Sequence, residues 1–149
     1  MPNTLKASQL LVDSHFALTS GQNDIALDLA NQALKIEPKS PDAHQCAADA
    51  YMSLERYNDA ITHYKDAVKY DPNNGNRYYD LGFSFATTER LVDALKNFEK
   101  AESLNNCTPE KIAQLHLLLG MVCFEIGRLK DSLSHLVDAE KLIGIDWVP

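Results

Sequence analysis

The 149-residue sequence contains few cysteines, and they form no recognisable framework. Cys46, Cys107 and Cys123 are an odd number, and none of them belongs to a CxxC pair. This disfavours a disulfide-stabilised scaffold and favours a reducing compartment, so we expect a cytoplasmic protein. Long apolar runs are lacking too. Nothing approaches the roughly 18 apolar residues of a membrane span, and the short run Leu10–Val12 ends at Asp13 with no leader-like cleavage site after it.

Basic residues are also in short supply. The chain has 14 Lys and Arg against 21 Asp and Glu, which gives a formal net charge of −7 and a pI near 5.1. Because this negative field repels polyphosphate, we expect neither nucleic acid nor an anionic membrane as a partner. With 45% hydrophobic and 23% charged residues, the chain has the composition of a soluble globular protein and the length of one domain.

What the sequence does contain is an internal repeat with a step of 34 residues. Pro38 and Pro72 are separated by this step. Two series of alanines keep the same step, namely Ala26, Ala60 and Ala94, and Ala33, Ala67 and Ala101. The predicted units are residues 7–40, 41–74, 75–108 and 113–146, with 109–112 as a one-turn insertion before the last unit. Such a period indicates a stack of small supersecondary units.

Each unit has the pattern of two helices joined by a short turn. Apolar residues recur at helical spacing in both helices, and no segment alternates with the period of a strand. Ser40-Pro41 and Thr108-Pro109 each place an N-cap hydroxyl before a proline at the first helical position. Pro38 and Pro72 end the preceding helices, because proline disfavours helical geometry in the residue before it. The predicted turns include Ser20-Gly21-Gln22, Glu55-Arg56 and Gly127-Arg128.

Small residues recur where the two helices of a unit are expected to cross. One position of the first helix holds Ser14, Ala48, Gly82 and Gly120, and one position of the second holds Ala26, Ala60, Ala94 and Ser132. Only small side chains let two helix backbones approach closely. Gly82 and Gly120 each cost about 1 kcal/mol in helix propensity, and a close helix contact offsets that cost.

With these features the sequence resembles the tetratricopeptide repeat family. The third unit carries most of the family pattern, at Tyr78, Leu81-Gly82, Phe85, Ala94, Phe98 and Ala101. The resemblance implies an all-α fold, a right-handed superhelix of four helix-turn-helix hairpins that forms a single domain over residues 1–149. It also implies a concave groove, lined by the first helix of each hairpin, that binds another protein.

The resemblance places the partner-binding residues on these first helices. By analogy they are Leu11, His15, Gln45, Asp49, Met52, Asn76, Tyr79, Phe83, Leu117, Met121 and Phe124. The expected surface is acidic in its middle, at Asp42 and Asp49, and apolar toward its C-terminal half. It suits a peptide or helix that is neutral or basic and has apolar anchors. The same apolar residues suit packing between neighbouring first helices equally well, and both roles stay open.

Other chemistries find little support in the sequence. Family members that clamp the acidic tail of heat-shock chaperones use lysine and asparagine. The equivalent positions here are Leu11, His15, Cys46, Asn76 and Asp80. Because the cationic residues are missing from this set, such tails are not expected to bind. No phosphate loop, nucleophile elbow or HExxH motif is present, and we expect neither catalytic residues nor a cofactor.

The histidines have a structural interpretation based on the repeat. His63 and His135 share one position of the second helix and are expected to face solvent. His44 and His116 share a position near the start of the first helix, where a large residue packs. A metal site made of Cys107, His116 and Cys123 lacks the usual ligand pairs, so no metal is expected.

The leading functional hypothesis is a protein–protein interaction module, an adaptor or scaffold. The alternative is a small dedicated chaperone, since chaperones of type III secretion translocators are similar in length and composition. The C-terminal end is apolar, with Leu129, Leu133 and Leu136 in the last helix and Trp147 in the tail 143–149. Because repeat arrays normally end in a polar capping helix, this end predicts a homodimer through the C-terminal hairpin or a tail folded back on it.

Overall fold

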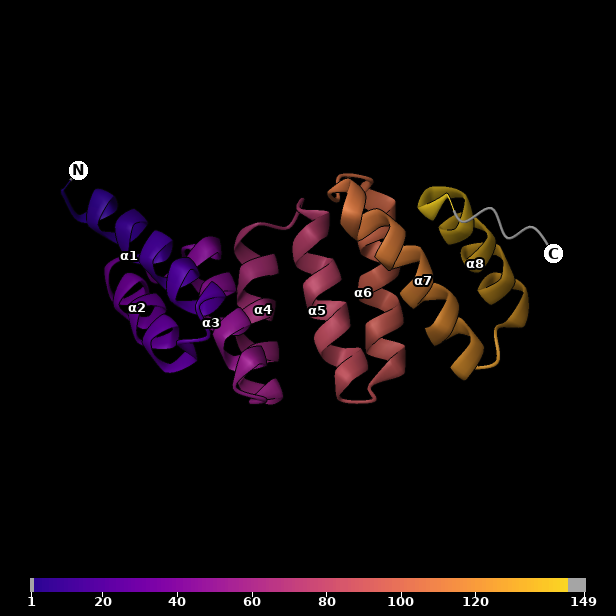
Figure 1. The fold of residues 1–149 in the computed structure, drawn as a ribbon, viewed down its shortest axis with the longest axis horizontal. Helices are drawn as coiled ribbons and strands as arrows, with labels where there is room; N and C mark the ends of the chain where they lie inside the picture. The colour runs from indigo at the N-terminus through magenta and orange to yellow at the C-terminus, as the bar shows by residue number, and fades with distance from the viewer. Residues whose placement is uncertain (1, 145–149) are drawn as a thin grey trace. The chain divides into compact units, whose positions relative to one another are not determined.

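The computed structural model describes residues 2–144, and the regular structure of these residues is entirely helical (Figure 1). The helices are α1 (Pro2–Thr19), α2 (Asn23–Ile36), α3 (Pro41–Ser53), α4 (Tyr57–Tyr70), α5 (Gly75–Thr87), α6 (Leu91–Leu104), α7 (Pro109–Glu125) and α8 (Leu129–Ile143). The predicted all-α fold is confirmed. None of the helices between residues 2 and 144 combines the length and the apolar character that crossing a bilayer requires.

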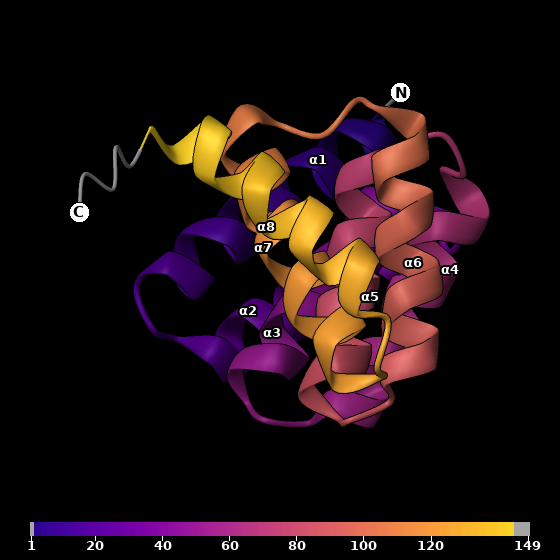
Figure 2. The same cartoon turned by 90° about the vertical axis from the view of Figure 1, so that its right-hand side faces the viewer.

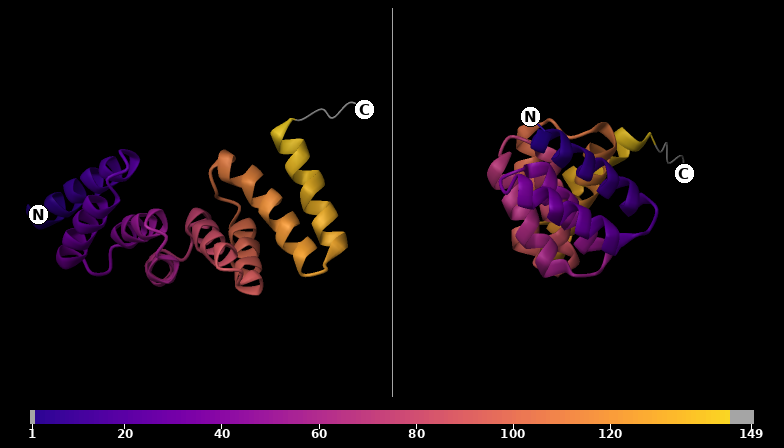
Figure 3. Two further views of the ribbon diagram at one scale, coloured as in Figure 1. Left: turned by 60° about the horizontal axis from the view of Figure 1, so that its bottom comes forward. Right: turned by 90° about the vertical axis from the view of Figure 1, so that its left-hand side faces the viewer.

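The chain divides into two compact units, Met1–Asn73 and Asn74–Pro149. Each unit holds two antiparallel hairpins: α1 pairs with α2 and α3 with α4 in the first, and α5 pairs with α6 and α7 with α8 in the second. Figures 2 and 3 show the last hairpin, in which α8 returns along α7 after a short turn. Two first helices start early, because α1 begins at Pro2 and the predicted insertion 109–112 forms the first turn of α7.

Pairs of small residues lie at the crossing point of each hairpin. The pairs are Ser14 with Ala26, Ala48 with Ala60, Gly82 with Ala94, and Gly120 with Ser132, and all eight residues are buried. Two hydrogen bonds fix this register directly. The Ser14 hydroxyl donates to the carbonyl oxygen of Ala26 at 2.7 Å, and the Ser132 hydroxyl donates to that of Gly120 at 2.8 Å. The predicted close helix contact is therefore confirmed in the first and last hairpins.

The hairpin turns share one backbone conformation. Gly21, Glu55, Glu89 and Gly127 occupy the equivalent turn position, and their φ angles are 75°, 58°, 59° and 82°. Glycine adopts this left-handed conformation freely, whereas other L-residues lose about 1–2 kcal/mol there. The two middle hairpins therefore place a glutamate where the outer two use glycine.

The helix ends follow the sequence with one exception. α2 and α4 each end two residues before the proline that was expected to stop them. Ser40 caps α3, because its hydroxyl oxygen accepts a hydrogen bond from the N–H of Ala43 at 3.2 Å. Thr108 is the N-cap residue of α7 before Pro109, as predicted, but its side chain makes no capping hydrogen bond. The N–H of Thr108 instead donates to Oδ1 of Asn76 at 3.1 Å, which joins the start of α7 to α5.

Candidate partner-binding site

A cleft of about 490 Å³ lies between the first helices of the first unit, α1 and α3. Its lining residues are Ser8, Leu11, Val12, His15, Asp42, Gln45, Cys46 and Asp49. They recur every three or four residues on each helix, which is the spacing that places side chains on one helical face. The structure thus brings together four of the residues that the sequence assigned to the groove: Leu11, His15, Gln45 and Asp49. Met52 follows on α3 but is not among the lining residues.

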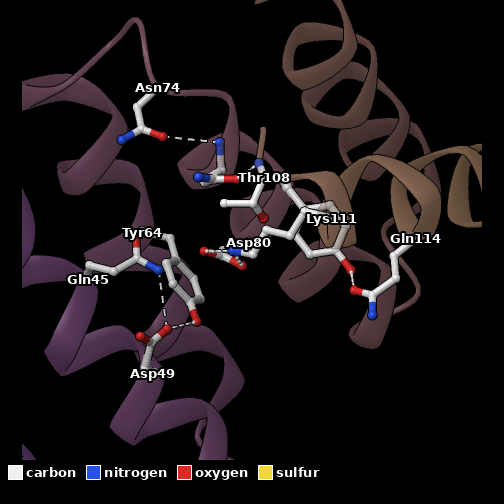
Figure 4. Close-up of polar contacts among 10 residues, drawn as sticks. Gln45, Asp49, Tyr64, Asn74, Asp80, Thr108, Lys111 and Gln114 are labelled. Atoms are coloured by element: carbon white, nitrogen blue, oxygen red, sulfur yellow. Dashed lines mark hydrogen bonds and ion pairs between the residues drawn. The ribbon is translucent and has the colours of Figure 1, made fainter. Parts of the chain in front are cut away.

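The cleft carries negative charge from α3. Asp42 is exposed in the first turn of α3, and Asp49 is partly buried two turns further along. Asp49 is held from two sides, because the Tyr64 hydroxyl donates to its Oδ1 at 2.6 Å and Nε2 of Gln45 donates to the same oxygen at 3.3 Å (Figure 4). Hydrogen bonds to the charged form keep this carboxylate oriented within the cleft. Neither lysine nor arginine occurs among the described lining residues.

In the second unit, polar contacts join the first helices α5 and α7. The Tyr79 hydroxyl donates to Oε1 of Gln114 at 2.9 Å, and Nζ of Lys111 lies 2.8 Å from Oδ1 of Asp80 (Figure 4). The Thr108–Asn76 bond lies at the start of both helices and the Tyr79–Gln114 bond lies further along each of them, so α5 and α7 run parallel. Lys111 is a residue that sequence reasoning missed. Its partner lies 31 positions earlier in the chain, and only the lengthened first turn of α7 brings the ammonium group there.

Tyr79 belongs to the core rather than to an open surface. Only 7% of Tyr79 is exposed, and its ring centroid lies 6.0 Å from the ring centroid of Phe98. Nζ of Lys111 lies 5.1 Å from the centroid of the Tyr79 ring. Burial, and secondarily the charge of Asp80, raise the pKa of the Tyr79 phenol, which therefore stays protonated as a hydrogen-bond donor. Of the two roles that the sequence left open for this residue, packing between helices describes its contacts.

An exposed apolar strip extends beyond the Tyr79–Gln114 bond. It consists of Phe83 on α5 and Leu117, Met121 and Phe124 on α7, which are 43%, 40%, 54% and 62% exposed. Phe83 lies one turn after Tyr79, and Leu117 lies one turn after Gln114 on the parallel helix. Leu117, Met121 and Phe124 follow at helical spacing along one face of α7. These four residues, named the apolar strip below, are therefore available for contact with another molecule.

Comparison with known proteins assigns the repeat. A family model described as TPR repeat matches residues 48–88, which run from α3 into α5. The predicted tetratricopeptide repeat is confirmed over these residues. Repeats of this kind build protein–protein interaction scaffolds, and the coarse function predicted from the sequence is thereby confirmed.

The relatives of this tetratricopeptide repeat chain agree on the fold. Small glutamine-rich tetratricopeptide repeat-containing protein 2 of Mycosarcoma maydis is 27% identical over 95 residues, which are 64% of this chain and 27% of that protein. The structure of MamA matches with a TM-score of 0.84 and 17% identity, covering 96% of this chain and 80% of that one. YrrB, described as a TPR protein with an unusual peptide-binding site, matches with a TM-score of 0.79 and 22% identity over 89% of this chain and 66% of that one. The chain spans between 16% and 28% of the curated relatives it matches.

Two of the histidines do not lie as predicted. His63 and His135 are partly buried rather than facing solvent, because each pairs with a histidine of the preceding helix. The Nδ1 atoms of His44 and His63 lie 3.1 Å apart, and those of His116 and His135 lie 3.4 Å apart. Burial, and secondarily the nearby His44, lower the pKa of His63. Both pairs have the same separation of 19 residues in the sequence, a signal that the repeat analysis contained but did not use.

Proposed function

We propose that this chain binds a segment of a partner protein through the α1–α3 cleft, and that the apolar strip contacts apolar side chains of the same class of partner. The observation that carries the proposal is the cleft itself. Its lining combines a partly buried carboxylate, an exposed carboxylate and the apolar side chains of Leu11 and Val12. Such a lining favours a ligand that is neutral or basic and has apolar anchors, because like charge across an interface is unfavourable. We propose that the function of this chain is to bind a partner and not to catalyse a reaction.

The apolar strip supports the second half of the proposal. Met121 and Phe124 are more than half exposed on a rigid helix, and full burial of either side chain is worth about 1.5–3 kcal/mol. Methionine and aromatic side chains adapt to partners of different shape. The described peptide-binding role of YrrB is a property of that protein, but it lends support to a peptide-sized ligand for a chain with this fold.

A pair of synthetic peptides tests the cleft. One 12-residue peptide alternates lysine with leucine and phenylalanine, and the other replaces each lysine with glutamate. We expect measurable binding of the lysine peptide by fluorescence anisotropy and none of the glutamate peptide at the same concentrations. Asp42→Asn should weaken binding of the lysine peptide, whereas Asp24→Asn should leave it unchanged. Asp24 is the matched control, since both aspartates are exposed and lie in the first turn of a helix but only Asp42 lines the cleft. Equal effects of the two variants on peptide binding would refute the proposed role of the cleft.

A second pair of variants tests the apolar strip. Met121→Ser combined with Phe124→Ser should weaken binding of the lysine peptide and leave the helical signal intact, since both side chains are exposed. Val92→Ser combined with Leu129→Ser removes comparable exposed apolar surface from α6 and α8 and serves as the control. Tyr79 is unsuitable for this test because its truncation would open a cavity in the core. If the control pair weakens binding as much as the strip pair, the strip has no specific role.

The chaperone alternative draws on the amount of exposed apolar surface. Besides the apolar strip, α8 carries Leu129, Leu133 and Leu142, each more than half exposed. A holding chaperone uses such surfaces to suppress aggregation of many unfolded chains, whereas an adaptor binds one segment with a defined stoichiometry. Suppression of the thermal aggregation of citrate synthase at equimolar chain, without saturable binding of the lysine peptide, would favour the chaperone.

Leu129 and Leu133, which lie one turn apart on α8, support self-association through the C-terminal hairpin. Two copies related by a two-fold axis would cover each other's exposed leucines. The alternative cover, the tail with Trp147, lies outside the described residues. Leu133→Glu places a charge on this face, and we expect it to convert a dimer to a monomer in light scattering. A wild-type chain that is monomeric at high micromolar concentration would exclude the dimer.

A further inference from the structure

Three side chains that can bind a metal ion converge in the second unit, and none of them lines the cleft or belongs to the apolar strip. They are Glu102 near the end of α6, His116 on α7 and His135 on α8. Nδ1 of His116 lies 3.4 Å from Nδ1 of His135, which lies 3.6 Å from Oε2 of Glu102. One donor atom of each residue lies within 4.8 Å of the other two. The cluster thus joins three consecutive helices of one compact unit.

These separations fit the requirements of a tetrahedral ion. Zinc binds histidine nitrogen at about 2.0–2.1 Å and carboxylate oxygen at about 2.0–2.2 Å, so two ligands of a tetrahedron lie about 3.3–3.5 Å apart. The His116–His135 and His135–Glu102 distances lie at or close to that range. Both histidines are partly buried and positioned by their helices, while Glu102 is exposed and is free to adjust its side-chain torsions.

The surroundings provide for a fourth ligand. A small cavity of about 30 Å³ is lined by Glu102 and His116, together with Asn105 and Cys107. A cavity needs roughly 10–15 Å³ to hold one water molecule. A zinc ion with three protein ligands keeps a fourth position for water or another small ligand.

From this geometry we propose that Glu102, His116 and His135 form a binding site for a divalent transition metal ion, and that this ion is zinc. Two imidazoles and one carboxylate suit zinc better than calcium or magnesium, which prefer oxygen ligands alone. The bound ion links the third hairpin, through α6, to the fourth hairpin, through α7 and α8. It therefore acts as a clamp within the second unit, and zinc stabilises that unit because it binds the folded state.

The first unit contains a natural control for this site. His44 and His63 form the repeat-equivalent pair, with Nδ1 atoms 3.1 Å apart. Nε2 of His44 lies 2.9 Å from the carbonyl oxygen of Pro38, which can only accept, so Nε2 donates. In the neutral imidazole, Nδ1 of His44 then accepts from Nδ1 of His63. In the repeat register, the position of Glu102 is taken by Leu34 in the first hairpin. The carboxylate near this pair is Asp66, whose Oδ2 lies 3.8 Å from Nδ1 of His44, but among the described residues these three do not form a metal-binding group as Glu102, His116 and His135 do.

Zinc titration of the full chain, without a polyhistidine tag and after treatment with EDTA, tests the proposal. We expect one zinc ion per chain by isothermal titration calorimetry and an increase in the melting temperature when zinc is added. His135→Asn introduces the residue found at the equivalent position of the third hairpin, Asn97, and should weaken zinc binding at least about tenfold. Glu102→Leu introduces the residue of the first hairpin and should do the same. His63→Asn should leave zinc affinity unchanged.

Substitution with Co²⁺ identifies the ligand atoms independently of affinity. A site of nitrogen and oxygen ligands gives tetrahedral d–d bands in the visible range without the near-ultraviolet thiolate-to-cobalt band that Cys107 or Cys123 would produce. Strong thiolate absorption, loss of zinc affinity in His63→Asn equal to that in His135→Asn, or no zinc binding at 1 mM would each overturn the proposal. Far-ultraviolet circular dichroism confirms that each variant is folded, so a loss of binding is assigned to the missing ligand.

Discussion

Replacement of Gly82 by alanine separates the demands of helix propensity from those of packing. Alanine is about 1 kcal/mol better than glycine in a helix interior, so propensity alone predicts stabilisation. However, a Cβ atom at Gly82 would lie 2.7 Å from Cδ1 and 2.8 Å from Cε1 of Phe98. Ordinary carbon contacts are about 3.5–4.0 Å, so two atoms overlap by close to 1 Å. Phe98 is fully buried and packs against Tyr79, which leaves its ring little room to move.

The expected net effect of Gly82→Ala is destabilisation. Overpacking of a well-filled core costs about 1–3 kcal/mol, from which the gain in propensity must be subtracted. We therefore expect a loss of about 1 kcal/mol in the free energy of unfolding. Gly120→Ala is the matched control, since its Cβ would lie 2.7 Å from the side chain of Leu136. Leu136 is 38% exposed and can turn toward solvent, so this variant should lie within about 0.5 kcal/mol of the wild type.

Urea denaturation followed by circular dichroism at 222 nm measures both variants, provided that the m values agree with the wild type. The clash is tested by adding Phe98→Leu, which provides space for the new methyl group. The loss in free energy of unfolding of the double variant Gly82→Ala, Phe98→Leu should be about 1 kcal/mol smaller than the sum of the losses of the two single variants. A stabilising Gly82→Ala, or additive effects in the double variant, would show that the ring does not restrict this position.

Three further predictions follow from the fold. Ala60→Leu should lower the free energy of unfolding by about 1–3 kcal/mol because Ala60 is fully buried at a helix crossing, whereas Thr62→Leu on the exposed face of α4 should have little effect in the same urea assay. Gly127→Ala should cost about 1 kcal/mol although its Cβ would meet no atom within 4 Å, since φ is 82°, and a calorimetric melting temperature equal to that of wild type would contradict this. His63 has a pKa below its usual 6.5 in the folded state, so the unfolded chain binds the proton more readily and stability declines as pH falls just below 6.5. His63→Asn should reduce that decline in urea midpoints measured between pH 7.5 and 5.5.

The sequence predicted the hairpins well because their determinants are local or strictly periodic. The 34-residue step located the helix crossings, and the two serine hydroxyls that bridge them, Ser14 and Ser132, stand at predicted positions. Prolines two residues beyond α2 and α4 ended those helices as expected. These signals depend on backbone preferences and side-chain size, which follow from the residue types of a single sequence.

The contacts that the sequence did not reveal depend on helix rotation and on side-chain reach. A helical position shared by His63 and His135 does not state whether it faces solvent or the preceding helix, and a rotation of a few tens of degrees decides between them. Lys111 reaches Asp80 only because α7 starts one turn early. Among the residues assigned to the groove, Leu11 and Gln45 meet in the α1–α3 cleft, whereas Tyr79 is buried. The partner-binding role of the whole set stays a prediction.

The start of α5 has a consequence for the chemical lifetime of the protein. Asn74 is followed by Gly75, and an asparagine–glycine pair deamidates readily when the glycine nitrogen is free to attack the asparagine side chain. Here the N–H of Gly75 donates to Oδ1 of Asn106 at 2.7 Å, while Oδ1 of Asn74 accepts from the N–H of Asn76 at 3.1 Å. Both reacting groups are therefore engaged in the folded chain, and cyclisation requires this corner of the second unit to open first. Deamidation at this bond thus reports on local opening of α5, so the slow appearance of aspartate and isoaspartate at position 74 measures how often the helix start opens.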